Sequence, residues 1–428
     1  MTDPIFDAIL GSDLDTVIRL ARAPEHREAR TSLSDLYGPF WESMTPLMVA
    51  AAAPGEKAAT VRALLDAGAD LAARSEGGAS AAFFAAGAGD YWVIDDAHGN
   101  SLQGPALAGD YAERLRMLLE AGADPQEVAP NGRNLPGEAA RAGDPIRLRM
   151  LLEVGASPHL TEATSEPRGM EGISARRPRN PFGHVWLHFP LANAAAGGSA
   201  ECVRLLLQAG ASIAEIDDDG KNALAHATSA EVAEALIHAG LDPDDESLWH
   251  QAIWEDKPEI AALLLEKGAD PEFLLDTTPL IYMAAYAGAT EIVHLLDRHG
   301  ADLGRLRQYG DSALHAAVSG MGPEPEKQEE LVRFFLARGL DIEGRDERAE
   351  TPLHKAAARE HGHAEAIEML LKLGAHPDPV NEAGDTPLIF AAESECEACV
   401  ALLLAAGADP DRPGQQGLSA RQFAKRWH

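Results

Sequence analysis

Two short clusters have residue types and spacing that could do chemistry. Cys396 and Cys399 form a C-x-x-C pair, a spacing that suits thiol–disulfide exchange or half of a zinc site. His361, His363 and Glu365 lie close together in the sequence and could supply metal ligands if a favourable loop gathered them. Each cluster also has a plainer interpretation, which depends on the elements that position its residues.

The stretch 351–377, TPLHKAAAREHGHAEAIEMLLKLGAHP, indicates what those elements are. Thr351 is a good helix N-cap, and Pro352 suits the first helical position. An Ala-rich helix, a glycine turn and a second helix with apolar residues at helical spacing follow. Gly374 is predicted to close the second helix in the left-handed conformation that glycine tolerates best. The stretch therefore predicts one helix–turn–helix unit.

The closing glycine recurs along the chain at intervals that are mostly near 33 residues. It stands at Gly68, Gly122, Gly155, Gly210, Gly240, Gly268, Gly300, Gly339, Gly374 and Gly407. With its TPLH starts and Ala-rich first helices, this pattern resembles the ankyrin repeat and indicates about ten copies. The resemblance implies an all-α solenoid of stacked helix–turn–helix units with β-hairpin-like fingers between them.

A repeat array needs ends that cover its last apolar faces, because each repeat buries its core against its neighbours. We therefore expect N-terminal cap helices and a loop in residues 1–44, the repeat array in 45–411 and a C-terminal capping helix in 412–428. Irregular spacing predicts insertions at about 90–107, 159–188 and 322–328.

The repeat gives the cysteines a plainer interpretation. When the repeats are aligned, Cys399 and Cys202 both fall at the core-facing position of Ala366. Free cysteine packs there as a small apolar residue. Three cysteines in 428 residues predict no disulfide framework, which fits a reducing compartment.

The histidines have a similar interpretation. In ankyrin repeats the histidine of the TPLH start hydrogen-bonds the backbone of the neighbouring loop, which implies that role for His315, His354 and His250. His363 stands at a Gly-His position common in the family, so metal binding by His361 and His363 is kept as the alternative. The chain has no G-x-x-x-x-G-K, G-x-S-x-G or H-E-x-x-H motif, and we expect no catalytic residue, cofactor or metal.

Charge and composition restrict the partners. A net charge of -32 argues against binding nucleic acid or anionic membranes. It fits a basic protein partner, and simple solubility is the alternative explanation. The N-terminal residues show no signal peptide, and no apolar run approaches the ~20 residues of a membrane span. A cytoplasmic protein, monomeric when unbound, is expected. Arg outnumbers Lys 28 to 8, which hints at a bacterial genome.

Candidate contact residues follow from the resemblance, since partners of ankyrin proteins usually bind the concave side. The variable positions at the exposed end of each first helix hold Arg141, Trp254, Glu255, Tyr286, Arg359 and Glu393. Trp254 and Tyr286 belong to consecutive repeats and should lie side by side as a binding hot spot, or else pack locally against a finger. The insertions offer a second surface, with Tyr91, Trp92, Arg176, Arg177, Arg179 and Trp186.

The sequence thus favours a non-catalytic scaffold that binds a protein on its concave face, on its insertions or on both. A sharper hypothesis is an immunity or antitoxin-like inhibitor of a cationic effector. Two alternatives remain open: a secreted, host-directed ankyrin effector, and an enzyme or metal-binding protein that uses the 159–188 insertion or the cluster of His361 and His363.

Overall fold

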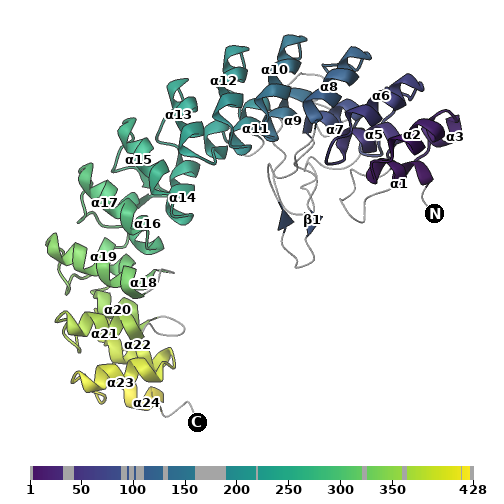
Figure 1. Cartoon of the computed structure of the whole chain (residues 1–428). Helices are drawn as coiled ribbons and strands as arrows, with labels where there is room; N and C mark the ends of the chain where they lie inside the picture. The colour runs from purple at the N-terminus through teal and green to yellow at the C-terminus, as the bar shows by residue number, and fades with distance from the viewer. Residues whose placement is uncertain are drawn as a thin grey trace, which may run out of the picture. The chain divides into compact units, whose positions relative to one another are not determined.

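The described part of the chain consists of two compact units. The computed structural model describes residues 3–31, 43–87, 94–95, 101–102, 110–128, 134–159, 189–217, 220–320, 325–358, 364–415 and 417–424. Unit 1 comprises Met1–Leu241 and unit 2 comprises Asp242–His428, and each is described by itself. Within each unit, helix pairs stack so that the first helices form one row and the second helices form another (Figure 1).

Unit 1 contains the N-terminal pairs. Its first row is α1 (Pro4–Leu10), α5 (Pro46–Ala52), α7 (Ala81–Gly87), α9 (Leu135–Arg141), α11 (Pro190–Ala196) and the 3-10 helix η3 (Ala223–His226). Its second row is α2 (Leu14–Ala21), α6 (Ala58–Asp66), α8 (Tyr111–Glu120), α10 (Pro145–Glu153), α12 (Ala200–Gln208) and α13 (Ala230–His238). The short helix α3 (Pro24–Arg27) and the antiparallel strands β1 (Ile94–Asp95) and β2 (Ser101–Leu102) lie outside these rows.

Unit 2 continues the same pattern. Its first row is α14 (Glu246–Trp254), α16 (Leu280–Ala287), α18 (Ala313–Ser319), α20 (Pro352–Ala357), α22 (Pro387–Glu393) and α24 (Ala420–Ala424). Its second row is α15 (Pro258–Glu266), α17 (Thr290–Arg298), α19 (Pro325–Ala337), α21 (Ala364–Lys372) and α23 (Glu397–Ala405). The first row lies on the inner side of the curve that unit 2 makes (Figure 1).

The sequence signals for helix starts and stops are present in the structure. Thr351 has the extended backbone of an N-cap, and Pro352 is the first helical residue of α20. All ten closing glycines have φ between 83° and 111°. A Cβ at any of them would meet nothing within 4 Å. Backbone conformation, not space, therefore requires glycine there.

The core lies between the two rows of each unit. In the ninth repeat, Ala366, which was predicted to face the core, is fully buried, and so are Ile367 and Leu370 of the same helix. Packing against both neighbouring pairs buries faces that one helix pair could not bury alone. The predicted all-α solenoid is confirmed.

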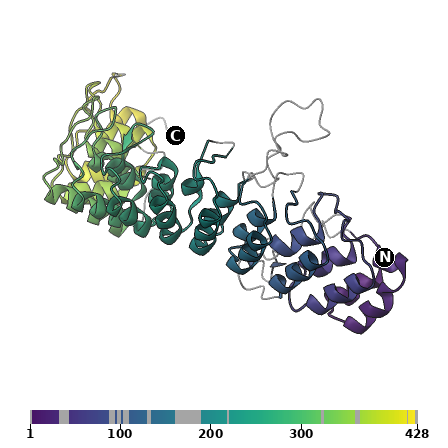
Figure 2. The same ribbon diagram turned by 90° about the horizontal axis from the view of Figure 1, so that it is seen from above.

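Finger turns connect successive pairs and project together from one side of unit 2 (Figure 2). A backbone hydrogen bond closes consecutive fingers from Arg307 to Asp311, from Asp346 to Glu350 and from Asn381 to Asp385, at 2.9 to 3.0 Å. The preceding finger has two short antiparallel strands, β3 (Leu274–Leu275) and β4 (Thr278–Pro279). Neighbouring fingers also bind each other, because the Glu347 N–H donates to the Tyr309 carbonyl at 3.1 Å.

Three regions differ from a uniform array. The α1–α2 pair stacks on α5 and α6, and α3 follows within the segment expected to be a loop. The short fifth repeat has η3 in place of a first α-helix. Residues 325–328 of the predicted 322–328 insertion form the first turn of α19, where Gln328 donates to the Ala317 carbonyl at 2.9 Å. The extra residues described there lengthen a helix instead of forming a loop.

Candidate functional site

Four ring side chains on α14 and α16 form a continuous row, here called the aromatic row. Trp254 lies edge-on to Tyr286, with ring centroids 6.1 Å apart and planes at 76°. His250 lies 5.9 Å from Trp254, and Tyr282 stacks 6.5 Å from Tyr286. Trp254 is the most accessible large apolar side chain of α14, at 39% exposed. The row therefore presents an indole ring to solvent on a support of other rings.

Helical spacing produces the aromatic row. His250 and Trp254 are four residues apart on α14, and Tyr282 and Tyr286 are four residues apart on α16, so each pair shares a helix face. Because α14 packs against α16, the two faces meet at Trp254 and Tyr286, as their places in consecutive repeats predict. Ring pairs of this kind contribute about 0.5–1.5 kcal/mol beyond buried area, and they hold the indole in place.

The prediction that His250 ties a neighbouring loop was wrong. His250 is exposed, and Trp249 takes the buried position beside it. The N-cap of α14 is Asp245, whose side chain accepts from the Leu248 N–H. His250 therefore comes two residues too late in the helix to complete a capping box.

His315 and His354 do tie neighbouring fingers, as the resemblance implied. The Nδ1 of His354 accepts from the Thr351 N–H at 3.1 Å, and its Nε2 donates to the Asp385 carbonyl at 3.2 Å. His315 makes the corresponding contact with the Glu350 carbonyl at 3.1 Å. Burial lowers the pKa of His354 to about 4 and also lowers the pKa of His315. Both rings are neutral structural groups at neutral pH.

Arg307, on the finger after α17, extends the aromatic row. Its guanidinium carbon lies 5.3 Å from the centre of the Tyr282 ring and 5.8 Å from that of Tyr309. Tyr309 is 58% exposed at the tip of this finger, whereas Tyr282 is buried, which raises the pKa of its phenol. A guanidinium that lies over two aromatic rings is attracted electrostatically to the face of each ring. The aromatic surface thus runs from α14 and α16 onto a finger.

Lys355 of α20 joins three carboxylates. Its ammonium lies 2.6 Å from Asp346, 2.8 Å from Glu350 and 3.2 Å from Asp311. Burial opposes its charge, but hydrogen bonds to Asp346 and Glu350 outweigh burial and raise the pKa of Lys355 above its usual range. Asp311, Asp346 and Glu350 are all buried, so this cluster is an internal link between α20 and two fingers.

The geometry of stacked helix pairs, finger ties and closing glycines matches a known family. A family model described as ankyrin repeats matches three times, over residues 176–247, 249–346 and 324–413. These matches cover more than half of the chain. The chain belongs to the ankyrin repeat family. Repeats of this family generally mediate binding to other proteins.

Curated ankyrin relatives match parts of the chain. Ankyrin repeat and SOCS box protein 16 of Homo sapiens is 32% identical over 249 residues, which are 52% of this chain and 53% of that protein. E3 ubiquitin-protein ligase KEG of Arabidopsis thaliana is 26% identical over 55% of this chain and 16% of its own length. Putative palmitoyltransferase ZDHHC13 of Danio rerio is 30% identical over 46% of this chain and 31% of its own length. The chain spans about half or less of these relatives.

The other predicted contact residues are dispersed over the ankyrin array. Glu255 follows Trp254 directly and pairs with Lys257 at 2.6 Å. Glu393 is exposed at the end of α22, and partial burial of its carboxyl raises its pKa. Arg141 is half-buried at the end of α9 in unit 1. Of this set, only Glu255 adjoins the aromatic row in sequence.

Seven predicted contact residues and two predicted metal ligands lie outside the described residues. They are Tyr91, Trp92, Arg176, Arg177, Arg179, Trp186, Arg359, His361 and His363. Tyr282, Arg307, Tyr309 and Lys355 were not among the predicted contacts. The i,i+4 spacing of Tyr282 and Tyr286 could have indicated the first of these, whereas the others depend on finger geometry.

The prediction for the cysteine pair was wrong in one respect. Cys399 is buried at the core position, as expected, and Cys202 is a buried free thiol whose pKa burial raises to about 11. However, Cys396 and Cys399 are joined by a disulfide. The N-cap of α23 is Cys396, so the three-residue separation brings its sulfur over the first turn, within reach of Cys399.

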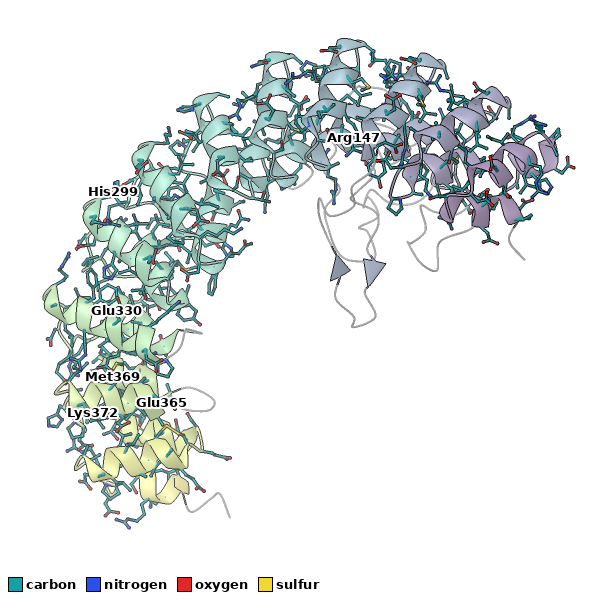
Figure 3. All side chains as sticks on the ribbon, in the orientation of Figure 1. Arg147, His299, Glu330, Glu365, Met369 and Lys372 are labelled. Atoms are coloured by element: carbon teal, nitrogen blue, oxygen red, sulfur yellow. A yellow bond between two sulfur atoms is a disulfide. The ribbon has the colours of Figure 1, made fainter. Side chains whose placement is uncertain are left out.

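Buried cations form a structural feature of unit 1 that the sequence analysis missed. Arg114 of α8 is fully buried and donates to the carbonyls of Ala50, Ala51 and Ala53 at the end of α5. Arg147 of α10 lies within the helical rows (Figure 3) and donates to the Ala85 carbonyl of α7 at 2.9 Å. Each arginine also pairs with an Asp at the start of its own helix. An Asp followed three or four residues later by Arg was the available signal.

The described residues show neither a metal-binding cluster nor a membrane-spanning helix. Within the described ranges, no group of three or more His, Cys, Asp or Glu side chains is arranged to hold a metal ion. Among the helices that the structure describes, none is long and apolar enough to cross a membrane.

Proposed function

We propose that this ankyrin chain is a non-catalytic scaffold whose unit 2 holds a protein partner against the aromatic row and the adjoining finger. The observation that carries the proposal is the exposed Trp254 ring, fixed edge-on to Tyr286 by two packed helices. Tryptophan and tyrosine at well-packed positions dominate many binding interfaces. Family membership supports the same general role.

The aromatic row is already ordered before a partner arrives. His250 and Tyr282 support its two ends, and both helices are held by neighbouring pairs. Little side-chain entropy is then lost on association, which favours affinity. The net charge of -32 speeds encounter with a basic partner and makes the association rate sensitive to salt.

The sharper form of the proposal is an inhibitor of a cationic effector, in the manner of an immunity protein. It rests on the acidic net charge of the chain. In this form the chain is a cytoplasmic monomer that associates with one basic protein. An association rate that does not change between low and high salt would contradict the basic partner and leave the scaffold role intact.

Affinity purification from the native organism tests the scaffold role. The double substitution Trp254→Ala and Tyr286→Ala is expected to reduce partner recovery at least about tenfold, because two central aromatic residues typically contribute 2 kcal/mol or more each. Leu404→Ala is the matched control, since Leu404 is a similarly exposed apolar residue on the second-row helix α23. Equal partner recovery by the wild-type chain, the double variant and Leu404→Ala would rule out the aromatic row as the contact surface.

Metal analysis tests the alternative that the chain carries metal-dependent chemistry. The scaffold proposal expects less than about one metal ion per purified chain. It also expects the same metal content after His361→Ala and His363→Ala. Stoichiometric metal that is lost in those variants would favour the enzyme hypothesis instead.

A further inference from the structure

The disulfide at the start of α23 has an accessible and an inaccessible sulfur. The Cα atoms of Cys396 and Cys399 lie 5.3 Å apart. Cys396 is partly exposed and occupies the N-cap, where its sulfur accepts the Cys399 N–H at 3.2 Å. Cys399 is fully buried. A reagent in solution can therefore reach only the Cys396 sulfur without opening the helix.

The fourth repeat shows the same site without a disulfide. In α12 the corresponding residues are Ser199 and Cys202, and the Ser199 hydroxyl accepts the Cys202 N–H at 3.3 Å. Cys202 is buried and unbonded there. In the ninth repeat the second position is the buried Ala366. The ankyrin fold thus accepts a small polar N-cap above an unbonded buried residue, so reduction need not disturb the stack.

We infer that Cys396 and Cys399 form a reversible thiol–disulfide exchange site whose substrates are small-molecule or protein thiols. The spacing, the N-cap position and the unequal exposure of the two sulfurs support it. In the reducing compartment that the proposed function assumes, a disulfide is usually transient or redox-sensing. The site lies on the second-row helix α23 and is independent of the aromatic row.

The exchange proceeds by two displacements at sulfur. A thiolate attacks Cys396, the S–S bond breaks, and a mixed disulfide forms while the electron pair leaves on Cys399, which takes a proton from water. A second thiolate attacks the outer sulfur of the mixed disulfide, so that the reagent leaves as its own disulfide and Cys396 becomes a thiolate. The start of α23 and the Cys399 N–H stabilise that negative charge. Oxidation follows the reverse steps.

The acidic neighbours influence which thiols react. Glu395 and Glu397 flank Cys396 in the chain, and Glu393 ends the preceding helix α22. Their charge repels anionic thiols such as glutathione more than reagents without carboxylates, such as dithiothreitol. Added salt should therefore speed reduction by glutathione more than reduction by dithiothreitol.

Alkylation of the native full-length chain tests the site. The protein is isolated without reductant, treated with dithiothreitol in native buffer, alkylated with N-ethylmaleimide and mapped by mass spectrometry. We expect Cys396 to become alkylated only after reduction, and the buried Cys399 to require urea as well. In a reduced sample without N-ethylmaleimide, oxidised glutathione should restore the bond. Cys202, which is buried, should stay unmodified until urea is added and serves as the internal control. A bond that opens only in urea, or thiols that stay separate in oxidised glutathione, would overturn the inference.

Two variants place residues found in other repeats at the cysteine positions, so a change in thiol reactivity can be told apart from a loss of folding. Cys396→Ser reproduces the Ser199 cap, and Cys399→Ala reproduces the Ala366 core position, so both should keep the native circular dichroism. The Cys396 thiol of Cys399→Ala should react at least about tenfold faster than the Cys399 thiol of Cys396→Ser, because only Cys396 is accessible. Equal rates would contradict Cys396 as the attacked sulfur. Both variants should retain any partner held by Trp254.

Discussion

Individual residues in this chain divide into those that the repeat explains and those that depart from it. His354 and His315 each tie their helix to the next finger. Trp254 and Arg307 depart from the repeat, because their contacts depend on aromatic rings of neighbouring elements. The first kind fixes the scaffold, and the second kind makes the surface that we propose for binding.

His354 should make the stability of unit 2 depend on pH. Burial holds its folded pKa at about 4, below the usual histidine value of 6.5, so between these values the unfolded chain binds a proton that the native ring does not. The free energy of unfolding should be fully retained above pH 6.5 and should fall as the pH drops towards 4, by about 2–3 kcal/mol. Urea denaturation across this range measures the slope.

Replacing His354 checks that assignment. His354→Leu should weaken the dependence of stability on pH, although it also removes the finger tie and lowers stability at neutral pH. His299→Leu is the control, since His299 is exposed at the end of α17 (Figure 3). If both variants kept the wild-type slope, the acid sensitivity would come from other groups.

At the scale of elements, the function of a helix depends on its row. First-row helices α14 and α16 carry the aromatic row on faces that the fingers border. Second-row helices α8 and α10 send buried arginines to the carbonyl ends of earlier first-row helices, as Arg114 does at α5. Such cations satisfy carbonyls that a helix end leaves without partners, and they favour the negative end of its dipole.

Arg114→Met should destabilise unit 1 by about 3 kcal/mol, because it leaves Asp110 and the α5 carbonyls without a buried cation. Arg116→Met is a matched control on the same helix. Arg116 is 46% exposed and pairs with Glu113 and Glu120, and exposed pairs of this kind contribute little to stability. Thermal unfolding of the two variants compares them directly, and similar losses would argue against the buried network.

At the scale of the whole molecule, the chain folds as two units, each a stack of helix pairs. Each helix pair contacts its neighbours in the stack, such as α8 with α6 and α10. Stability in such arrays is close to a sum of local and nearest-neighbour contributions. Unfolding therefore need not be a single cooperative transition.

Hydrogen exchange in the Arg114→Met variant tests this locality. Faster exchange is expected in α5, α6 and α8, with little change in α20 to α23 of unit 2, because the perturbed contacts end within a few repeats. Peptide-level mass spectrometry resolves the two units. A uniform increase across both units would show that the array unfolds as one body.

The sequence by itself determined the repeating part of this protein. Capping residues, proline at the first helical position, closing glycines and apolar spacing act over a few residues and recur with the repeat, so they predicted the helix pairs and their buried faces. They also predicted that Trp254 and Tyr286 would meet, since both occupy the same place in consecutive repeats.

Only the tertiary structure decided the parts that join distant segments. Arg307 reaches Tyr282 across a finger, and Lys355 gathers carboxylates from two different fingers. His250 is exposed because α14 begins after Asp245, which places the histidine beyond the capping position. These contacts depend on how adjacent repeats pack and where each finger turns, and local sequence patterns do not encode that geometry.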